Sequence, residues 1–176
     1  MLYTFDGKSP TVGRDTYVSE TAVVIGDVRI GDCCYVGHGA IVRGDYGTII
    51  VGDGTAVEEG VIVHAPPQGR CVIGRKVTLG HGAIIHAAVI GDAATIGMGA
   101  VVSIRARVGS HAIVAEGAVV KREQKVPESV VVAGNPARVV RKVTPEDEAN
   151  GDWAKQLYID LAAKYLKIGM QKFLPE

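Results

Sequence analysis

The stretch IGRKVTLGHGAIIHAAVIGDAATIGMGAVV, residues 73–102, repeats one pattern about every six residues. Each unit opens on an aliphatic residue, glycine commonly follows it, and a small residue stands four places further on. A period of six with an aliphatic and a small partner fits a triangular coil. Each hexapeptide then makes one short strand and one corner, and three hexapeptides make one turn.

The same frame extends over most of the chain. Aliphatic side chains are expected to fill the coil interior, and the small partners let the chain turn each corner without crowding. The aliphatic positions are Val12, Val18, Val24, Ile30, Val36, Val42, Ile73, Leu79, Ile85, Ile90, Ile96, Val102, Val108, Val114 and Val120. The small partners are Ala22, Cys34, Ala40, Ala83, Ala94, Ala100, Ala106, Ala112 and Ala118.

The repeat is interrupted in three places. RGDYGTII follows Val42, HAPPQGRCV lies between Val63 and Ile73, and the unit from Ile85 to Ile90 is one residue short. We expect the first two insertions to protrude from the coil as loops, which are common sites of function on rigid scaffolds.

The repeat fades after Val120, and a helix is predicted over about 145–168. Thr144 is a suitable N-cap, proline follows it, and acidic residues occupy the first turn. The sequence therefore divides into a mainly β coil, 1–143, and a C-terminal helical segment, 144–176, which we expect to pack on one face of the coil. Its predicted apolar face contains Trp153, Leu157, Leu161 and Leu166, with Ile159, Ala162 and Tyr165 beside them.

Charge and composition narrow the possible partners. Lys plus Arg and Asp plus Glu both number 19, which favours neither a nucleic-acid nor a membrane-surface partner. No segment approaches the roughly 20 apolar residues that span a bilayer, and the first residues do not resemble a signal peptide, so we expect a cytoplasmic protein. Cys33, Cys34 and Cys71 have no CxxC spacing and are interpreted as reduced structural thiols.

Counting in repeats brings two histidines together. Val63 and Ile85 begin units that are one full turn apart, so His64 and His86, which directly follow them, should stack on one face roughly 5 Å apart. Two imidazoles at that spacing can reach one ion at a zinc–nitrogen distance of about 2.0–2.1 Å.

His81 lies one unit earlier, on a different face of the coil. Packing of three coils around a threefold axis would bring His81 of one chain to the His64 and His86 pair of its neighbour. Three imidazoles match an open catalytic zinc shell. We interpret His38 and His111 as solvated or hydrogen-bonded surface residues.

The segments VRGDYG, VIVH, LGHGAIIH, IGMGAVV and AGNPARVVR, with the spacing His-x16-His-x4-His, resemble the γ-class carbonic anhydrases. The resemblance implies a left-handed parallel β-helix and a homotrimer with metal sites between subunits. It implies that His64 and His86 of one chain and His81 of the next hold Zn²⁺ (or Fe²⁺/Co²⁺), and that carbon dioxide is hydrated to bicarbonate. By the same resemblance, Arg43 and Asp45 organise the interface and the site edge, and Tyr158 lies near the site.

Two positions depart from that family. Ala56 and Glu58 stand where the family usually has asparagine and glutamine. A carboxylate at Glu58 is able to accept a proton or to bind the metal itself, so we expect weakened or altered activity. Glu59 is interpreted as a solvated charge at the rim of the site.

Two other functions fit the same pattern. An acyltransferase that uses acetyl-coenzyme A shares the hexapeptide repeat and the GNPA segment, and would use one histidine as its general base. A non-catalytic metal-binding trimer is the reading that Ala56 and Glu58 favour.

Overall fold

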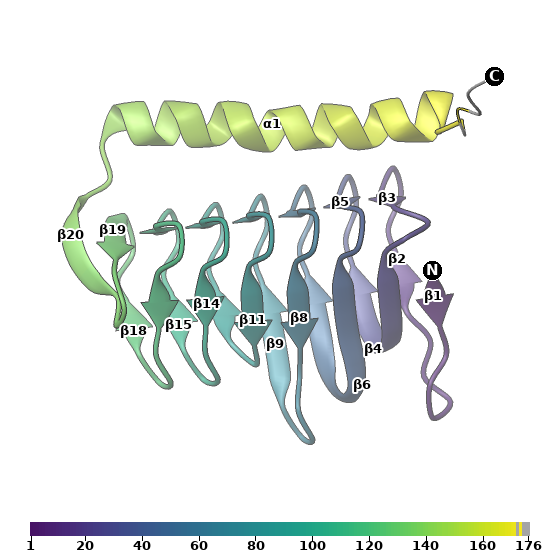
Figure 1. The fold of residues 1–176 in the computed structure, drawn as a ribbon, viewed down its shortest axis with the longest axis horizontal. Coiled ribbons are helices and arrows are strands. Elements are labelled where there is room, and N and C mark those ends of the chain that lie inside the picture. The colour runs from purple at the N-terminus through teal and green to yellow at the C-terminus, as the bar shows by residue number, and fades with distance from the viewer. Residues whose placement is uncertain (172, 174–176) are drawn as a thin grey trace.

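The computed structural model describes residues 1–171 and 173. The chain forms a left-handed coil of short, parallel strands with one long helix beside it (Figure 1). The smaller sheet contains β3 (Tyr17–Val18), β5 (Tyr35–Val36), β7 (Ala56–Val57), β10 (Thr78–Leu79), β13 (Thr95–Ile96), β16 (Ile113–Val114), β19 (Val130–Ala133) and β20 (Arg138–Lys142). The named strands pair in parallel except for β19 with β20, and one isolated antiparallel bridge joins Phe5 to Lys8.

The larger sheet covers two sides of the coil. Its members are β1 (Leu2–Tyr3), β2 (Thr11–Val12), β4 (Val23–Ile30), β6 (Ile41–Val51), β8 (Ile62–His64), β9 (Arg70–Ile73), β11 (Ile84–His86), β12 (Val89–Ile90), β14 (Val101–Val102), β15 (Arg107–Val108), β17 (Val119–Val120) and β18 (Lys125–Val126). Strand β6 joins the two sides, because its first half pairs with β8 and its second half with β9.

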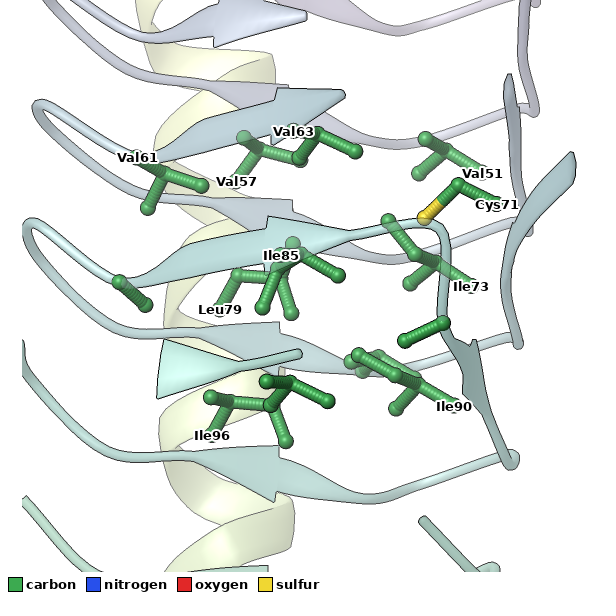
Figure 2. Close-up of a cluster of buried hydrophobic side chains, with 14 of the residues drawn as sticks. Val51, Val57, Val61, Val63, Cys71, Ile73, Leu79, Ile85, Ile90 and Ile96 are labelled. Carbon is green, nitrogen blue, oxygen red and sulfur yellow. The ribbon is translucent and has the colours of Figure 1, made fainter. Parts of the chain in front are cut away.

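The strand register confirms the hexapeptide frame. Val63 pairs with Ile85, and Val57 pairs with Leu79, so three units make one turn. The aliphatic side chains point into the interior, where successive turns stack them on one another (Figure 2). The small partners are buried as well: Ala22, Cys34, Ala40, Ala83, Ala94, Ala100, Ala106, Ala112 and Ala118. Close packing of this interior gives a rigid frame that fixes the side chains at its edges.

The two longer insertions behave differently. Residues 65–69 form the expected loop between β8 and β9, which protrudes from one edge of the coil (Figure 1). The expectation of a loop after Val42 was wrong, because these residues continue as the single long strand β6. The extra residues instead carry the strand around a corner, with a shift of register against β4 between Gly26 and Val28.

Helix α1 (Pro145–Ile168) runs back along the coil and contacts β3, β5 and β7 (Figure 1). Its start is as predicted: the Thr144 side chain accepts from the Asp147 N–H, and the Asp147 carboxylate accepts from the Thr144 N–H. The predicted packing face was partly wrong, since Trp153, Leu157 and Leu166 are exposed.

The helix packs through Ala162 and Tyr165, which belong to the predicted set, and through Tyr158, which does not. Tyr165 stacks on Tyr17 with ring centroids 4.5 Å apart, and Tyr158 lies against Tyr35 at 5.2 Å. Aromatic pairs at these distances contribute about 0.5–1.5 kcal/mol beyond burial alone. The aromatic side chains of the coil therefore select which face of the helix turns inward.

The three cysteines are free thiols, as expected. Burial raises the pKa of Cys34 and of Cys71 to about 11, so both remain protonated near neutral pH. Within the part of the chain that the structure describes, no helix has the length and apolar character needed to cross a membrane.

Candidate metal centre

His64 and His86 end two neighbouring strands, β8 and β11, and pair with one another in register. Their rings are stacked, with centroids 5.1 Å apart and an interplanar angle of 15°. The strand spacing of a parallel sheet produces this distance directly. The stacking predicted from the repeat is therefore confirmed.

Both imidazoles of this pair present a buried nitrogen that has no hydrogen-bond partner. These atoms are Nε2 of His64 and Nε2 of His86. Burial, followed by the charge of Arg43 and the neighbouring His86, lowers the pKa of His64. A neutral imidazole with an unused nitrogen is the form that binds a metal ion, so the pair fits a cation of the zinc class.

Arg43 and Asp45 lie at the edge of the pair, on the bent strand β6. The Arg43 guanidinium donates to Asp45 over 2.7 Å, and the other oxygen of Asp45 is 3.7 Å from Nε2 of His64. Burial opposes ionisation of Asp45, but the hydrogen bond to Arg43, the charge of Arg43 and the backbone N–H groups of Tyr46 and Asp45 together outweigh that effect and lower the pKa of the carboxyl group. The pair of charges thus holds a fixed anion beside the histidines.

A groove of about 490 Å³ opens beside the two histidines. It is bordered by an apolar ladder, here defined as Ile41, Ile62, Ile84, Val101 and Val119, which pair in register on successive turns. The three isoleucines are exposed in the subunit. An aligned apolar stripe next to a polar site is typical of a surface that another protein covers.

His81 lies at another corner of the coil, between two glycines that the local geometry requires. A side chain at Gly80 would approach the carbonyl oxygen of Ile96 to 2.9 Å, and Gly82 has a φ of 69°. Glycine meets both demands at little steric cost. The sequence Gly-His-Gly therefore places His81 at a tight corner just after β10.

Both ring nitrogens of His81 face carboxylates. Nε2 is 3.2 Å from Oε2 of Glu58, and Nδ1 is 2.8 Å from Oε2 of Glu59. Glu59 also accepts from the Tyr35 hydroxyl over 2.6 Å, so a chain of contacts runs from Tyr35 through Glu59 to His81. The expectation that Glu59 is a solvated rim charge was wrong.

Glu58 is the most buried charged group at this corner, with 6% of its side chain exposed. Burial raises its pKa, while His81, the Tyr158 hydroxyl and the His81 backbone N–H favour the ionised form. Burial, the charge of Glu58 and the bond to it raise the pKa of Tyr158, so its hydroxyl remains a donor. Tyr158 thus lies beside Glu58.

Within one subunit the residues form two separate groups. His64, His86, Arg43 and Asp45 make one, and His81, Glu58, Glu59, Tyr35 and Tyr158 make the other. Residues 1–171 and 173 contain no cluster of three or more metal-ligating side chains within a single chain. Ala56 is buried in β7 and contributes no polar group to either set.

The remaining histidines lie elsewhere. Nδ1 of His38 is 2.6 Å from the Ser19 hydroxyl, and its ring meets Tyr165 edge-on. His111 is exposed and lines a small cavity near the start of α1. Neither belongs to the two groups above. Tyr35 is the residue at the site that the sequence analysis missed.

The fold and the stacked histidines define the class of protein: a hexapeptide-repeat, left-handed parallel β-helix. No protein-family profile matches the chain. A crystal structure of a hexapeptide transferase family protein from Anaplasma phagocytophilum superposes with a TM-score of 0.89 at 35% identity, covering 93% of this chain and 97% of that one.

Curated relatives narrow the class to a family. The chain is 39% identical over 168 residues to gamma carbonic anhydrase 2, mitochondrial, from Arabidopsis thaliana, covering 92% of this chain but only 60% of that protein. It is 30% identical over 172 residues to a carbonic anhydrase from Geobacillus kaustophilus, covering 98% and 94%. The chain therefore belongs to the γ-carbonic anhydrase family, a family of lyase-type enzymes.

Proposed function

We propose that this protein is a homotrimeric, metal-dependent enzyme that hydrates carbon dioxide to bicarbonate. His64 and His86 of one subunit and His81 of the next hold the metal. The observation that carries the proposal is the pair of stacked imidazoles with buried, unpartnered Nε2 atoms. Leaving two such nitrogens unpaired is costly unless another group binds them.

A second subunit is the natural occupant of the groove. The apolar ladder lies beside the histidine pair, and its exposed isoleucines are regularly spaced along the coil. A neighbouring coil packed there around a threefold axis would bury the ladder and present a different corner to the pair. His81 stands on such a corner, on the turn of the coil that also carries His86, whereas His38 stands on the same corner two turns earlier.

Zn²⁺, Fe²⁺ or Co²⁺ held by neutral imidazoles supplies an acidic water near neutral pH. The protein's own residues then have distinct tasks. Glu59 fixes the His81 ring through Nδ1, and Tyr35 fixes Glu59 in turn. The Glu58 carboxylate is placed to hold a proton, and Arg43 keeps the Asp45 carboxylate at the site edge.

Complementation between two inactive variants tests the shared site. His81→Ala and His86→Ala each remove one ligand, so neither homotrimer should bind metal or hydrate carbon dioxide. In trimers assembled from an equal mixture, about one quarter of the interfaces join an intact His64 and His86 pair to an intact His81. We expect metal content and hydration rate to recover to about that fraction of the wild type.

The mixture must be unfolded and reassembled, and His111→Ala serves as a control that removes a histidine outside both groups. Mixed trimers that stay metal-free would contradict a site shared between subunits. Metal-loaded protein that hydrates no carbon dioxide but consumes acetyl-coenzyme A would instead support an acyltransferase, the function suggested by the name of the Anaplasma protein.

A further inference from the structure

Glu58 occupies a position at the site that histidine ligation alone does not explain. We propose that the Glu58 carboxylate is a fourth protein ligand of the metal, beside the three histidines. The inference rests on the proposed function, since it requires an ion at His81. It goes further by assigning the ion a ligand set of three nitrogens and one carboxylate oxygen.

The distance between the two donor atoms supports direct ligation. Oε2 of Glu58 and Nε2 of His81 are 3.2 Å apart. Two ligands that each bind one ion at about 2.0–2.2 Å, and subtend an angle between a right angle and a tetrahedral one, are separated by about 2.9–3.5 Å. The observed separation lies inside that interval. Glu58 therefore needs no large movement to share an ion with His81.

The surroundings hold the carboxylate in this position. The His81 backbone N–H donates to the same oxygen over 3.0 Å, and Tyr158 bonds the carboxyl group from the helix. Glu59 engages Nδ1 of His81, which leaves Nε2 as the nitrogen directed at Glu58. Both donors are thus oriented by contacts that remain available when an ion lies between them.

Burial gives the carboxylate a reason to bind a cation. Its side chain is 6% exposed, whereas that of His81 is 47% exposed. An ionised carboxylate removed from water requires a compensating charge. A divalent cation bound between Oε2 of Glu58 and Nε2 of His81 would supply that charge.

A carboxylate oxygen changes which metals the site prefers. Oxygen is a harder donor than imidazole nitrogen, and a fourth protein ligand together with water raises the coordination number to five or more. Zn²⁺ favours four ligands in a tetrahedral arrangement, whereas Fe²⁺ and Co²⁺ accept five or six. Glu58 should therefore favour Fe²⁺ and Co²⁺ relative to the site with glutamine at this position.

The absorption spectrum of Co²⁺ reports the coordination number directly. The metal-free forms of wild type, Glu58→Gln and Glu58→Ala are each loaded with one equivalent of Co²⁺. The visible absorption band is recorded for each, and the amount of bound cobalt is measured separately. Glu116→Gln is the matched control, because it removes an exposed carboxylate from the same corner of the coil two turns beyond His81, outside both groups of site residues. We expect a weak band in wild type and in Glu116→Gln, typical of five or six ligands, and a several-fold stronger band in both Glu58 variants.

Competition between Fe²⁺ and Zn²⁺ gives an independent readout. The preference for Fe²⁺ should fall by about tenfold in Glu58→Gln, the size of effect expected for a lost ligand contact. Identical cobalt spectra in wild type and both Glu58 variants, with cobalt bound in each, would overturn the inference and leave the proposed function standing. Failure of every form to bind cobalt would overturn both.

Discussion

The two halves of the proposed metal centre differ in how their histidines are satisfied within one chain. His64 and His86 stack on each other and leave two buried Nε2 atoms without a partner. His81 is half-exposed, yet a carboxylate lies at each of its ring nitrogens. One half therefore offers two free imidazole nitrogens, and the other half brings two carboxyl groups to one imidazole.

This difference assigns complementary roles to the halves. The histidine pair supplies two imidazole donors, and burial lowers the pKa of His64, which favours its neutral form. The His81 corner supplies the carboxylates that balance a divalent ion. Neither half is complete alone, so assembly of subunits and binding of metal should be coupled.

The largest expected effect comes from separating the halves. Ile62→Asp places a charge in the middle of the apolar ladder, between Ile41 and Ile84. Burying an unpaired carboxylate at an interface is strongly unfavourable, so the trimer should dissociate. Sedimentation should give the mass of one subunit, and metal content should fall nearly to zero although all three histidines remain.

Val139→Asp is the matched control for that change. Val139 is also an exposed aliphatic strand residue, but it lies on β20, the last strand of the smaller sheet. This variant should stay trimeric and keep its metal. An Ile62→Asp protein that remains trimeric with a full complement of metal would show that the ladder is not the interface.

The backbone of the site could be predicted from sequence because the repeat fixes the register. Val63 and Ile85 begin units one turn apart, and that alone stacks His64 on His86. The same count places Glu59 directly below His81, since each stands two residues after the paired Val57 and Leu79. The signal for Glu59 was therefore present, and the mistake was to treat it as an isolated surface charge.

Other parts of the site depend on side-chain packing that no period encodes. The Tyr35 hydroxyl reaches Glu59 only because the ring lies against Tyr158 of the helix. The inward face of α1 was partly mispredicted for the same reason. Leu161, Ala162 and Tyr165 pack inward as predicted, but the stripe that contains Trp153 is exposed, because the helix turns its tyrosines toward Tyr17 and Tyr35. Hydrophobic periodicity ranks residues by polarity and does not detect such aromatic contacts.

The free energy of unfolding of the metal-free protein should also distinguish the two halves, by a smaller effect than the loss of assembly in Ile62→Asp. His81→Ala leaves Glu58 buried without its neighbour, which should lower the free energy of unfolding by about 1–2 kcal/mol. His86→Ala removes a buried nitrogen that has no partner, so the change should stay within about 0.5 kcal/mol. Denaturant unfolding in the presence of a chelator, at one fixed protein concentration, measures both values.

Equal losses in the two variants would contradict the contrast between the halves. The carboxylates would then gain little from His81 in the metal-free protein. A larger loss of unfolding free energy in His86→Ala than in His81→Ala would reverse the contrast. The stacked histidine pair would then be stabilised by contacts other than a metal ion.

The smallest expected effect concerns the start of α1, which touches neither half. The Arg141 side chain, together with the Thr144 N–H and hydroxyl, holds the pKa of Asp147 well below its usual range. A lowered folded-state pKa means that the stabilisation is fully present above the unfolded value of about 3.9 and is lost as the pH falls below it. Asp147→Asn should therefore lower the melting temperature near pH 7, and the gap to wild type should narrow on acidification below about pH 4.

Asp160→Asn is the control on the same helix, because Asp160 is exposed and accepts only from Gln156 among the hydrogen bonds of the described residues. Its melting temperature should follow that of wild type across the same pH range. Metal affinity and the cobalt spectrum should be unchanged in Asp147→Asn, since Tyr158, the helix residue beside Glu58, lies several turns along the helix from this cap. A changed cobalt spectrum would show that the start of the helix affects the positions of the residues around His81. The two halves would then differ in their dependence on the helix as well as in charge.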